Sequence, residues 1–222
     1  MNTQKKPSLL LHYSLWTILG LVVIGFIFGY LYSGLHQPFF ARAKAPALPI
    51  NSTVPPFVDL RDSADQPRSL NDFKGKIWVV DFIFTTCPSS CKTMTSRMKE
   101  LQDALGKNSQ VKLVSFTVDP ETDTPSVLRE YGKLHGANPS QWLFLTGPPA
   151  SIYNIAHKGF YLGFQETSGE DAITFGKYTH STRFALVDRE GRVRAYHDAF
   201  DQQFIQKMLA DIENLENEEK KP

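Results

Sequence analysis

The sequence predicts an α/β sandwich with a mixed central sheet, preceded by one N-terminal transmembrane helix. Three observations support this fold class. Apolar, strand-like segments alternate with helical patterns through the middle of the chain, a hairpin and a final helix follow them, and a long uncharged apolar run precedes them all. Strands that alternate with helices favour a parallel sheet, and a terminal hairpin adds antiparallel strands, so a mixed sheet is expected.

The composition allows one globular domain with a short appendage. The chain has 222 residues, of which 41% are hydrophobic and 21% are charged, values that are ordinary for a packed core with a polar surface. The 24 basic and 23 acidic side chains leave a net charge of +1. This balance provides no basic surface that would attract nucleic acid, so nucleic-acid binding is not expected.

The apolar run near the N-terminus predicts a membrane anchor. No Asp, Glu, Lys or Arg occurs in residues 7–41, and residues 15–32 form an 18-residue apolar stretch. A helix rising about 1.5 Å per residue would cover most of a hydrocarbon layer of roughly 30 Å. Lys5 and Lys6 precede the stretch, so the positive-inside rule places the N-terminus in the cytoplasm. We expect a single-pass protein of a bacterial inner membrane, with its soluble domain on the periplasmic or outer side.

A cleaved signal peptide is the competing interpretation of the same segment. The small-residue patterns Ala41-Arg42-Ala43 and Ala43-Lys44-Ala45 resemble cleavage sites, but the apolar run is longer than the usual core of about 7–15 residues. Both interpretations export the domain. The predicted organisation is a cytoplasmic stub and anchor (1–36), an Ala- and Pro-rich linker (37–56), the globular domain (57–216) and a frayed tail (217–222).

The predicted strands come from apolar runs rich in β-branched and aromatic residues. The longest, residues 76–84, is nearly continuous in this character, as is typical of a buried central strand. A hairpin is expected around Glu190-Gly191. The other strands are expected at 111–118, 141–145, 183–187 and 192–196, with short edge pieces at 57–60 and 69–73.

The predicted helices come from apolar residues at helical spacing. Residues 89–105 place Met94, Met98, Leu101 and Leu105 on one stripe. Thr124-Pro125 is the expected N-cap and first position of a second helix, which Gly136 ends. A shorter helix is expected at 149–158, and Asp201 is the expected cap of the last one.

The chemistry of the chain is expected at its two cysteines. Cys87 and Cys91 follow the buried strand directly and open the first long helix. A spacing of four places both sulfurs on one helical face, about one turn apart. Backbone N–H groups at a helix N-terminus favour negative charge, so both thiols are expected to have a lowered pKa. Soft thiolates select copper(I), zinc or iron–sulfur centres over hard cations.

His180 is the expected third ligand. It stands just before the predicted strand 183–187, and that strand is expected to run beside the strand leading into Cys87. A set of two thiolates and one imidazole suits copper in either oxidation state. A structural zinc site normally takes four ligands, and the sequence offers no evident fourth.

With these residues in place, the sequence resembles the Sco/SenC family of copper proteins, which assist assembly of the binuclear copper centre of cytochrome oxidase. The resemblance extends over roughly residues 54–210. Its most specific segments are Asp81-Phe82-Ile83-Phe84-Thr85-Thr86-Cys87-Pro88-Ser89-Ser90-Cys91, Val118-Asp119-Pro120-Glu121-Thr122-Asp123-Thr124-Pro125 and Tyr178-Thr179-His180-Ser181-Thr182.

The resemblance implies a function as well as a fold. It implies a thioredoxin-like domain, copper(I) or copper(II) held by Cys87, Cys91 and His180, and subunit II of cytochrome c oxidase as the partner. Asp119 would lie near the site, either supporting the ligands or docking the partner. The chain departs from the family at Lys92, where Pro often follows the second cysteine. The expected function is that of a copper chaperone, not an enzyme.

Two other interpretations of the cysteine pair stay open. Cys87 and Cys91 could form a redox-active disulfide in an exported thiol–disulfide reductase or redox sensor, although thioredoxin-type enzymes use two intervening residues and this chain has three. The pair could also be structurally inert, heading a core stripe. Met94 and Met98 are expected in the core, His135 as a partly cationic helix end, and His157 and His197 at the surface.

Overall fold

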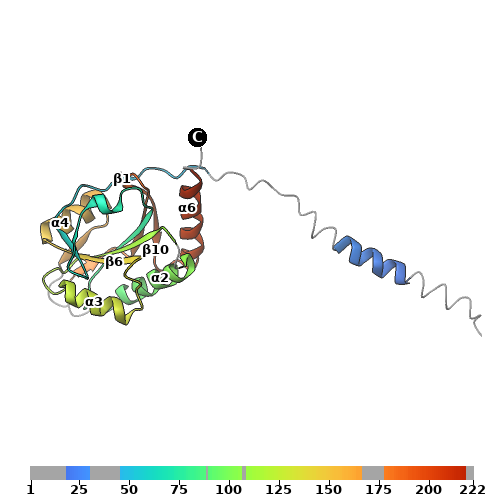
Figure 1. The fold of residues 1–222 in the computed structure, drawn as a ribbon, viewed down its shortest axis with the longest axis horizontal. Helices are drawn as coiled ribbons and strands as arrows, with labels where there is room; N and C mark the ends of the chain where they lie inside the picture. The colour runs from blue at the N-terminus through green and yellow to red at the C-terminus, as the bar shows by residue number, and fades with distance from the viewer. Residues whose placement is uncertain (1–18, 31–45, 89, 107–108, 167–177, 219–222) are drawn as a thin grey trace, which may run out of the picture. The chain divides into compact units, whose positions relative to one another are not determined.

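The computed structural model describes residues 19–30, 46–88, 90–106, 109–166 and 178–218. The chain divides into two compact units, Met1–Pro46 and Ala47–Pro222. In the first unit, residues 19–30 form a helix (Figure 1). The predicted membrane span 15–32 extends at both ends outside the described residues. Within the ranges described, no helix is both long enough and apolar enough to cross a bilayer.

The second unit is built on a mixed sheet, as the sequence predicts. Its central strands β4 (Trp78–Ile83), β5 (Lys112–Thr117) and β6 (Trp142–Thr146) are parallel, and the neighbouring pairs on both sides are antiparallel. The strand order is β1-β10-β9-β4-β5-β6-β2-β3. The flanking strands are β1 (Ser52–Thr53), β10 (Arg192–Asp198), β9 (Arg183–Val187), β2 (Leu60–Asp62) and β3 (Pro67–Arg68).

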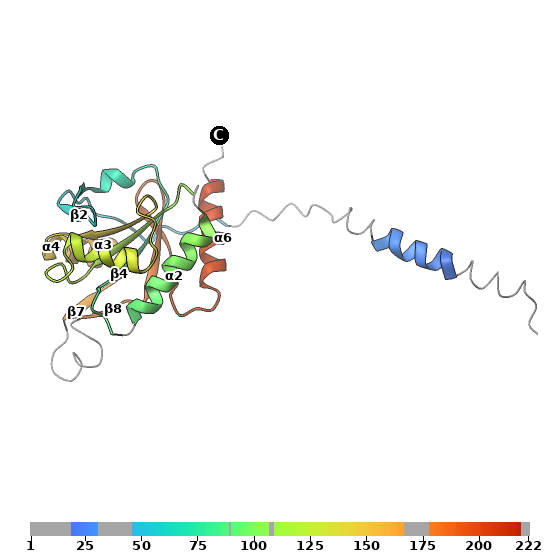
Figure 2. The same ribbon diagram turned by 60° about the horizontal axis from the view of Figure 1, so that its bottom comes forward.

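Three helices cover one face of this sheet and lie side by side (Figure 2). They are α2 (Ser90–Leu105), α3 (Pro125–Leu134) and α6 (Phe204–Glu218). Hydrogen bonds join them: Thr95 of α2 to Tyr131 of α3 at 2.7 Å, and Arg97 of α2 to the Ala199 carbonyl before α6 at 3.1 Å. The other face carries η1 (Leu70–Phe73), α4 (Pro149–Asn154) and the π-helical turn η2 (Ile155–Gly159).

The two faces have different cores. All six residues of β4 are buried, and they alternate between the faces because successive side chains of a strand point in opposite directions. Trp78 and Phe82 meet an aromatic cluster, with ring centroids 6.0 and 5.5 Å from that of Phe160. Asp81 therefore points to the opposite face, toward α2. There Met94 and Met98 are fully buried, which confirms their predicted place in the core.

Several boundaries differ from the predictions. Residues 69–73, predicted as an edge strand, form the 3₁₀ helix η1, because Asp72 accepts a hydrogen bond from the Ser69 backbone in a capping box. The predicted helix 149–158 is α4 followed by the π turn η2. The predictions did not include the hairpin of β7 (Phe164–Glu166) and β8 (Tyr178–His180), which forms a separate two-stranded sheet.

The start of the second unit overlaps the range predicted as linker. Strand β1, at Ser52–Thr53, lies within residues 37–56 and pairs with β10. Leu48 is also held, because its backbone N–H donates to Glu218 of α6 at 3.1 Å. The chain therefore joins the domain where the C-terminal helix ends.

Candidate metal centre

The two cysteines lie where β4 turns into α2. The backbone N–H of Cys87 donates to the Phe84 carbonyl at 3.2 Å, which forms a tight turn after the strand. Cys91 sits in the first turn of α2, one residue after the helix begins. Both cysteines are thiols and both are buried, with exposed fractions of 6% and 1%. Strand, turn and helix together fix the two sulfurs at the carboxyl end of β4.

The buried environment changes the expected acidity of Cys91. The hydrogen bond with Cys87, followed by burial, raises the pKa of the Cys91 thiol well above its ordinary value. A backbone hydrogen bond from Phe84 opposes this shift. The prediction of a lowered pKa for both thiols is therefore wrong for Cys91, because the hydrogen bond with Cys87 and burial outweigh the helix terminus.

Asp81 and Tyr131 belong to this centre, although the sequence analysis assigned them no role. Asp81 is fully buried in β4, and its charge contributes to the raised pKa of Cys91. Burial raises the pKa of Tyr131, and the charges of Cys91, Asp81 and Cys87 add to that shift. These four groups are thus electrostatic neighbours. A charged residue inside an otherwise apolar strand was the sequence signal that could have identified Asp81.

Asp123 holds the loop that leads to Cys87. Its carboxylate accepts a hydrogen bond from the Thr85 backbone N–H at 3.0 Å, a short one from the Thr85 hydroxyl, and one from Thr117 at 2.5 Å. Asp123 is fully buried, and burial raises its pKa despite these three donors. The loop after β5 therefore positions the loop after β4, two residues before the first thiol.

Asp119 lies in the same turn. Its backbone carbonyl accepts from Asp123 at 2.8 Å, and its backbone N–H donates to the Thr117 hydroxyl at 3.0 Å. Its side chain is 2% exposed, and its charge adds to the raised pKa of Asp123. Thr124 caps α3, as the sequence predicts, because its side chain accepts from the Val127 backbone N–H at 3.5 Å.

The backbone of His180 reaches the same end of the sheet. Strand β9 pairs with β4 in antiparallel register, with Val80 opposite Ala185, so β9 begins at the end where β4 finishes. His180 is the last residue of β8, three residues before β9 begins, and pairs with Phe164 of β7. The predicted neighbourhood of these two strands is confirmed. The imidazole itself lies outside what the structure describes.

A recess adjoins the turn that contains Asp119. Its cavity volume is about 380 Å³, and its lining includes Val118, Pro120 and Tyr153, together with Phe164. Phe164 of β7 pairs with His180, so the recess borders the hairpin that carries the predicted imidazole ligand. It is mainly apolar, as the surface that receives a partner's side chain would be.

The other histidines have structural surroundings. His157 is half-buried: its ring stacks on that of the exposed Tyr153, with centroids 3.9 Å apart, and its Nε2 atom is buried. His197 pairs with Asp211 of α6 at 2.9 Å. His135 stands at the C-terminal cap of α3, as predicted, and burial lowers its pKa below that of a free imidazole. Among the side chains that the structure describes, no three of His, Cys, Asp or Glu form a metal-binding cluster.

Comparison with known proteins identifies the family of this fold and site. The model of the family described as SCO1/SenC matches residues 48–217, which include both cysteines and His180. The chain belongs to the SCO1/SenC family. The resemblance found in the sequence is thereby confirmed, and so is the thioredoxin-like α/β fold with a mixed sheet, which SCO1/SenC structures share.

The SCO1/SenC relatives are distant in sequence but match most of the domain. The "SCO1 protein homolog" of Bacillus subtilis is 32% identical over 168 residues, covering 75% of this chain and 84% of that protein. The "Putative copper-binding protein" of Stutzerimonas stutzeri is 32% identical over 160 residues, covering 70% and 74%. The solved structure of BsSco, whose title reports a disulfide switch in a member of the Sco family of cytochrome c oxidase assembly proteins, is 30% identical, with a TM-score of 0.67 and coverage of 77% and 98%.

Proposed function

We propose that this chain is a membrane-anchored copper chaperone that binds copper through Cys87, Cys91 and His180 and assists metallation of the binuclear copper centre of cytochrome c oxidase. One observation carries the proposal. Two buried thiols stand at the carboxyl end of β4, and the antiparallel pairing of β9 with β4 directs the backbone of His180 to the same end. Copper is the cargo of this proposed chaperone.

The donor set supports copper over hard cations. Two thiolates and one imidazole match a soft or borderline ion, and a four-residue spacing lets one ion bridge both sulfurs. Because metal binding requires thiolates, copper must displace the proton from each thiol, including the one that Cys91 holds strongly in the metal-free protein. A relative named as copper-binding and a family member titled as an oxidase assembly protein support the same assignment.

The surroundings of the site supply positioning and charge. Asp123 fixes Thr85 and thereby the approach to Cys87, while the buried Asp81 adds negative charge near the thiols. A negative charge in a poorly hydrated site favours a cation more strongly than it would in water. The partner in this proposal is subunit II of the oxidase, and the apolar recess beside Asp119 is the surface offered to it.

The experiment is a competitive copper(I) titration of the full chain against a chromogenic chelator. We expect one copper(I) per chain, and a loss of affinity exceeding about 100-fold for Cys87→Ala and for Cys91→Ala, beyond the usual cost of removing an outer partner of a metal. His180→Ala should weaken binding and change the copper(II) absorption spectrum. His135→Ala and Met98→Leu are the matched controls. An unchanged affinity and spectrum in His180→Ala would refute the three-ligand site.

A thiol–disulfide function is the second candidate, favoured by the hydrogen bond between the two thiols. In that reaction Cys87 and Cys91 become a disulfide, losing two electrons and two protons, and a partner disulfide becomes two thiols. Metal-free protein would then reduce a disulfide peptide at a rate that His180→Ala leaves unchanged. Absent turnover in the metal-free wild type would exclude this function and leave copper binding as the role of the pair.

A further inference from the structure

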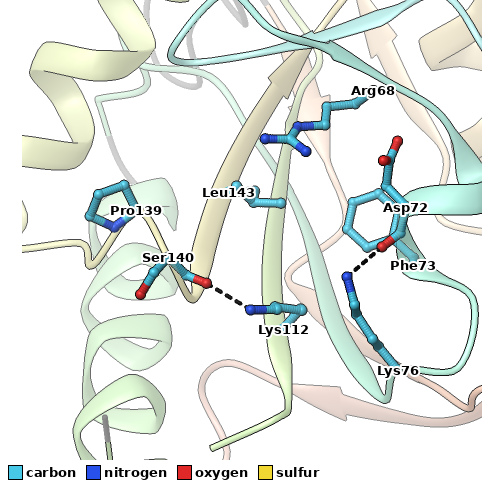
Figure 3. Close-up of a pocket in the computed structure, with 8 residues that line it drawn as sticks. All are labelled: Arg68, Asp72, Phe73, Lys76, Lys112, Pro139, Ser140 and Leu143. Atoms are coloured by element: carbon cyan, nitrogen blue, oxygen red, sulfur yellow. Dashed lines mark hydrogen bonds between the residues drawn. The ribbon is translucent and has the colours of Figure 1, made fainter. Parts of the chain in front are cut away.

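A basic pocket has its two lysines at the end of the sheet opposite the cysteines. Its cavity volume is about 230 Å³, and its eight lining residues include Arg68, Lys76 and Lys112 (Figure 3). Lys112 begins β5 and Lys76 precedes β4 by two residues, so both stand where the parallel strands start. The thiols stand where β4 ends. Six residues of strand at about 3.3 Å each separate the two regions by roughly 20 Å.

The two lysines are held in place without being neutralised. Lys76 donates to the Asp72 backbone carbonyl and Lys112 to the Ser140 backbone carbonyl, both at 2.7 Å (Figure 3). Each ammonium has three donors, so these single bonds leave two N–H groups for a ligand. By contrast, Lys99 and Lys133 pair directly with carboxylates on their own helices.

Arg68 adds a third cation to the pocket. Its Nε and Nη2 atoms donate to the buried Asp62 carboxylate at 2.8 and 2.7 Å. Five donors make up a guanidinium, so the remaining N–H groups stay available in a fixed plane. Asp62 therefore orients Arg68 and balances its charge, but leaves part of its hydrogen-bonding capacity for a ligand.

The one acidic side chain among the lining residues is already engaged. The Asp72 carboxylate accepts from the Ser69 backbone N–H at 2.7 Å and from its hydroxyl at 3.1 Å, as the cap of η1. The backbone bond from Ser69 chiefly holds the pKa of Asp72 below its ordinary value, so its charge is −1 at neutral pH. Arg68 is balanced by its partner Asp62, so the two lysines and Asp72 leave the pocket with a net charge of +1. Burial lowers the pKa of Lys112, and the like charge of Lys76 in the same pocket lowers it further.

We propose that the pocket lined by Arg68, Lys76 and Lys112 is a binding site for a phosphate monoester group. Such a group carries a charge of about −1.5 to −2 at neutral pH and presents three strong acceptor oxygens. Its negative charge suits two lysines that have no carboxylate partner, and its oxygens match the donors left on Lys76, Lys112 and Arg68. A carboxylate has only two oxygens and would leave part of this donor set unused.

Two sources of this group fit the location. One is a soluble phosphate compound. The other is a lipid with a phosphomonoester headgroup, a source that rests on the proposed membrane anchor. The chain enters the domain at this same end of the sheet, where Arg194 donates to the Leu48 carbonyl and to Asp188, just beyond the end of β9. The backbone N–H of Gly75, next to Lys76, donates to Arg189 of that same turn.

The test is calorimetric titration of the full chain in phosphate-free buffer, with inorganic phosphate and with short-chain phosphatidic acid. We expect saturable binding of phosphate, and a dissociation constant at least about tenfold higher in Lys76→Gln/Lys112→Gln. The loss of one good charge-assisted hydrogen bond weakens binding by about this factor. Lys74→Gln, an exposed neighbour outside the pocket, should bind like the wild type. The single variant Lys76→Gln is the second probe, should the double variant fold poorly.

The two sources give different results. Equal affinity for phosphate and phosphatidic acid points to a soluble compound, whereas phosphatidic acid binding at least about tenfold more tightly, with the gain lost in the double variant, points to a lipid headgroup. Equal binding by the wild type and both lysine variants overturns the proposal, as does the absence of saturable binding of either probe. Copper titration of the same variants should be unchanged, which separates this site from the thiol centre.

Discussion

Two buried acids at opposite ends of the central sheet, Asp123 and Asp188, are satisfied in opposite ways. At the end where β4 and β5 finish, Asp123 is held by neutral donors, the hydroxyls of Thr85 and Thr117 and a backbone N–H. At the end where these strands begin, Asp188 is held by guanidinium groups, with Arg194 at 3.0 Å and Arg192 at 2.7 Å. Neutral donors leave the carboxylate's charge uncompensated, whereas arginines cancel it.

This difference assigns a separate role to each end. The charge of the buried Asp81 acts on the Cys91 thiol, so that end favours a cation. The opposite end joins the chain's entry to its last helix and gathers excess positive charge around Lys76 and Lys112. Ligand sites of α/β sheets usually lie beyond the carboxyl ends of the parallel strands, and the thiol centre follows this rule.

The largest expected effect concerns Arg194. Its side chain is 6% exposed, and it donates to Asp188, to Glu218 and to the Leu48 and Pro49 carbonyls. Arg194→Met should lower the free energy of unfolding by about 3 kcal/mol, because it leaves buried acceptors and a charge without their partner. Urea unfolding measures this loss. Copper affinity should stay within about twofold of the wild type, because the thiols lie at the other end.

The control for this variant is Arg192→Met. Arg192 is 36% exposed and also pairs with Asp188, so its removal should cost no more than about 1 kcal/mol. A copper affinity that falls together with stability in Arg194→Met would show that the two ends are energetically coupled. It would contradict the separate roles assigned to them.

An intermediate effect is expected from Asp123→Ala. The change removes the acceptor of three hydrogen bonds, including two from Thr85, and should lower the free energy of unfolding by about 2 kcal/mol. Copper(I) affinity should fall about tenfold, since the support of a ligand loop typically contributes that much. Asp103→Ala, which removes an exposed partner of Lys99, is the control and should cost about 0.5 kcal/mol or less. Unchanged copper affinity in a folded Asp123→Ala protein would remove its positioning role.

The smallest effect is the pH dependence of stability, which should have opposite signs at the two ends. Burial raises the pKa of Asp123, so its folded form binds a proton more readily than its unfolded form. Its stabilising contribution is complete below the unfolded value of 3.8 and is lost as the pH rises through the raised value. The Ser69 backbone lowers the pKa of Asp72, so its contribution is present above 3.8 and is lost as the pH falls.

Urea unfolding across this acidic range, for Asp123→Asn and Asp72→Asn against the wild type, measures both slopes. As the pH rises, the free energy of unfolding of the wild type should fall relative to that of Asp123→Asn. Over the same range it should rise relative to that of Asp72→Asn. Slopes of the same sign in the two variants would contradict the contrast between the ends.

Much of the fold was predictable because its signals are local. The apolar run of β4, the helical stripe of α2 and the Thr124 cap of α3 all depend on residues within a few positions of one another. The predictions failed where a side chain made a local bond that a strand pattern conceals, as Asp72 does with Ser69 in η1. They also missed β7 and β8, whose pairing partners are about a dozen residues apart or more.

The sequence by itself determined the thiol pair, its place between a buried strand and a helix, and the family that carries this motif. Only the tertiary structure decided that Asp81 faces the thiols, that Asp123 holds Thr85 from 38 residues away, and that Lys76 and Lys112 share one pocket. The physical reason is that spacing along the chain sets which residues share a turn or a face, whereas burial and charge depend on which distant elements pack together. Acidity, positioning and excess charge are therefore properties of the packed sheet, and no single segment contains them.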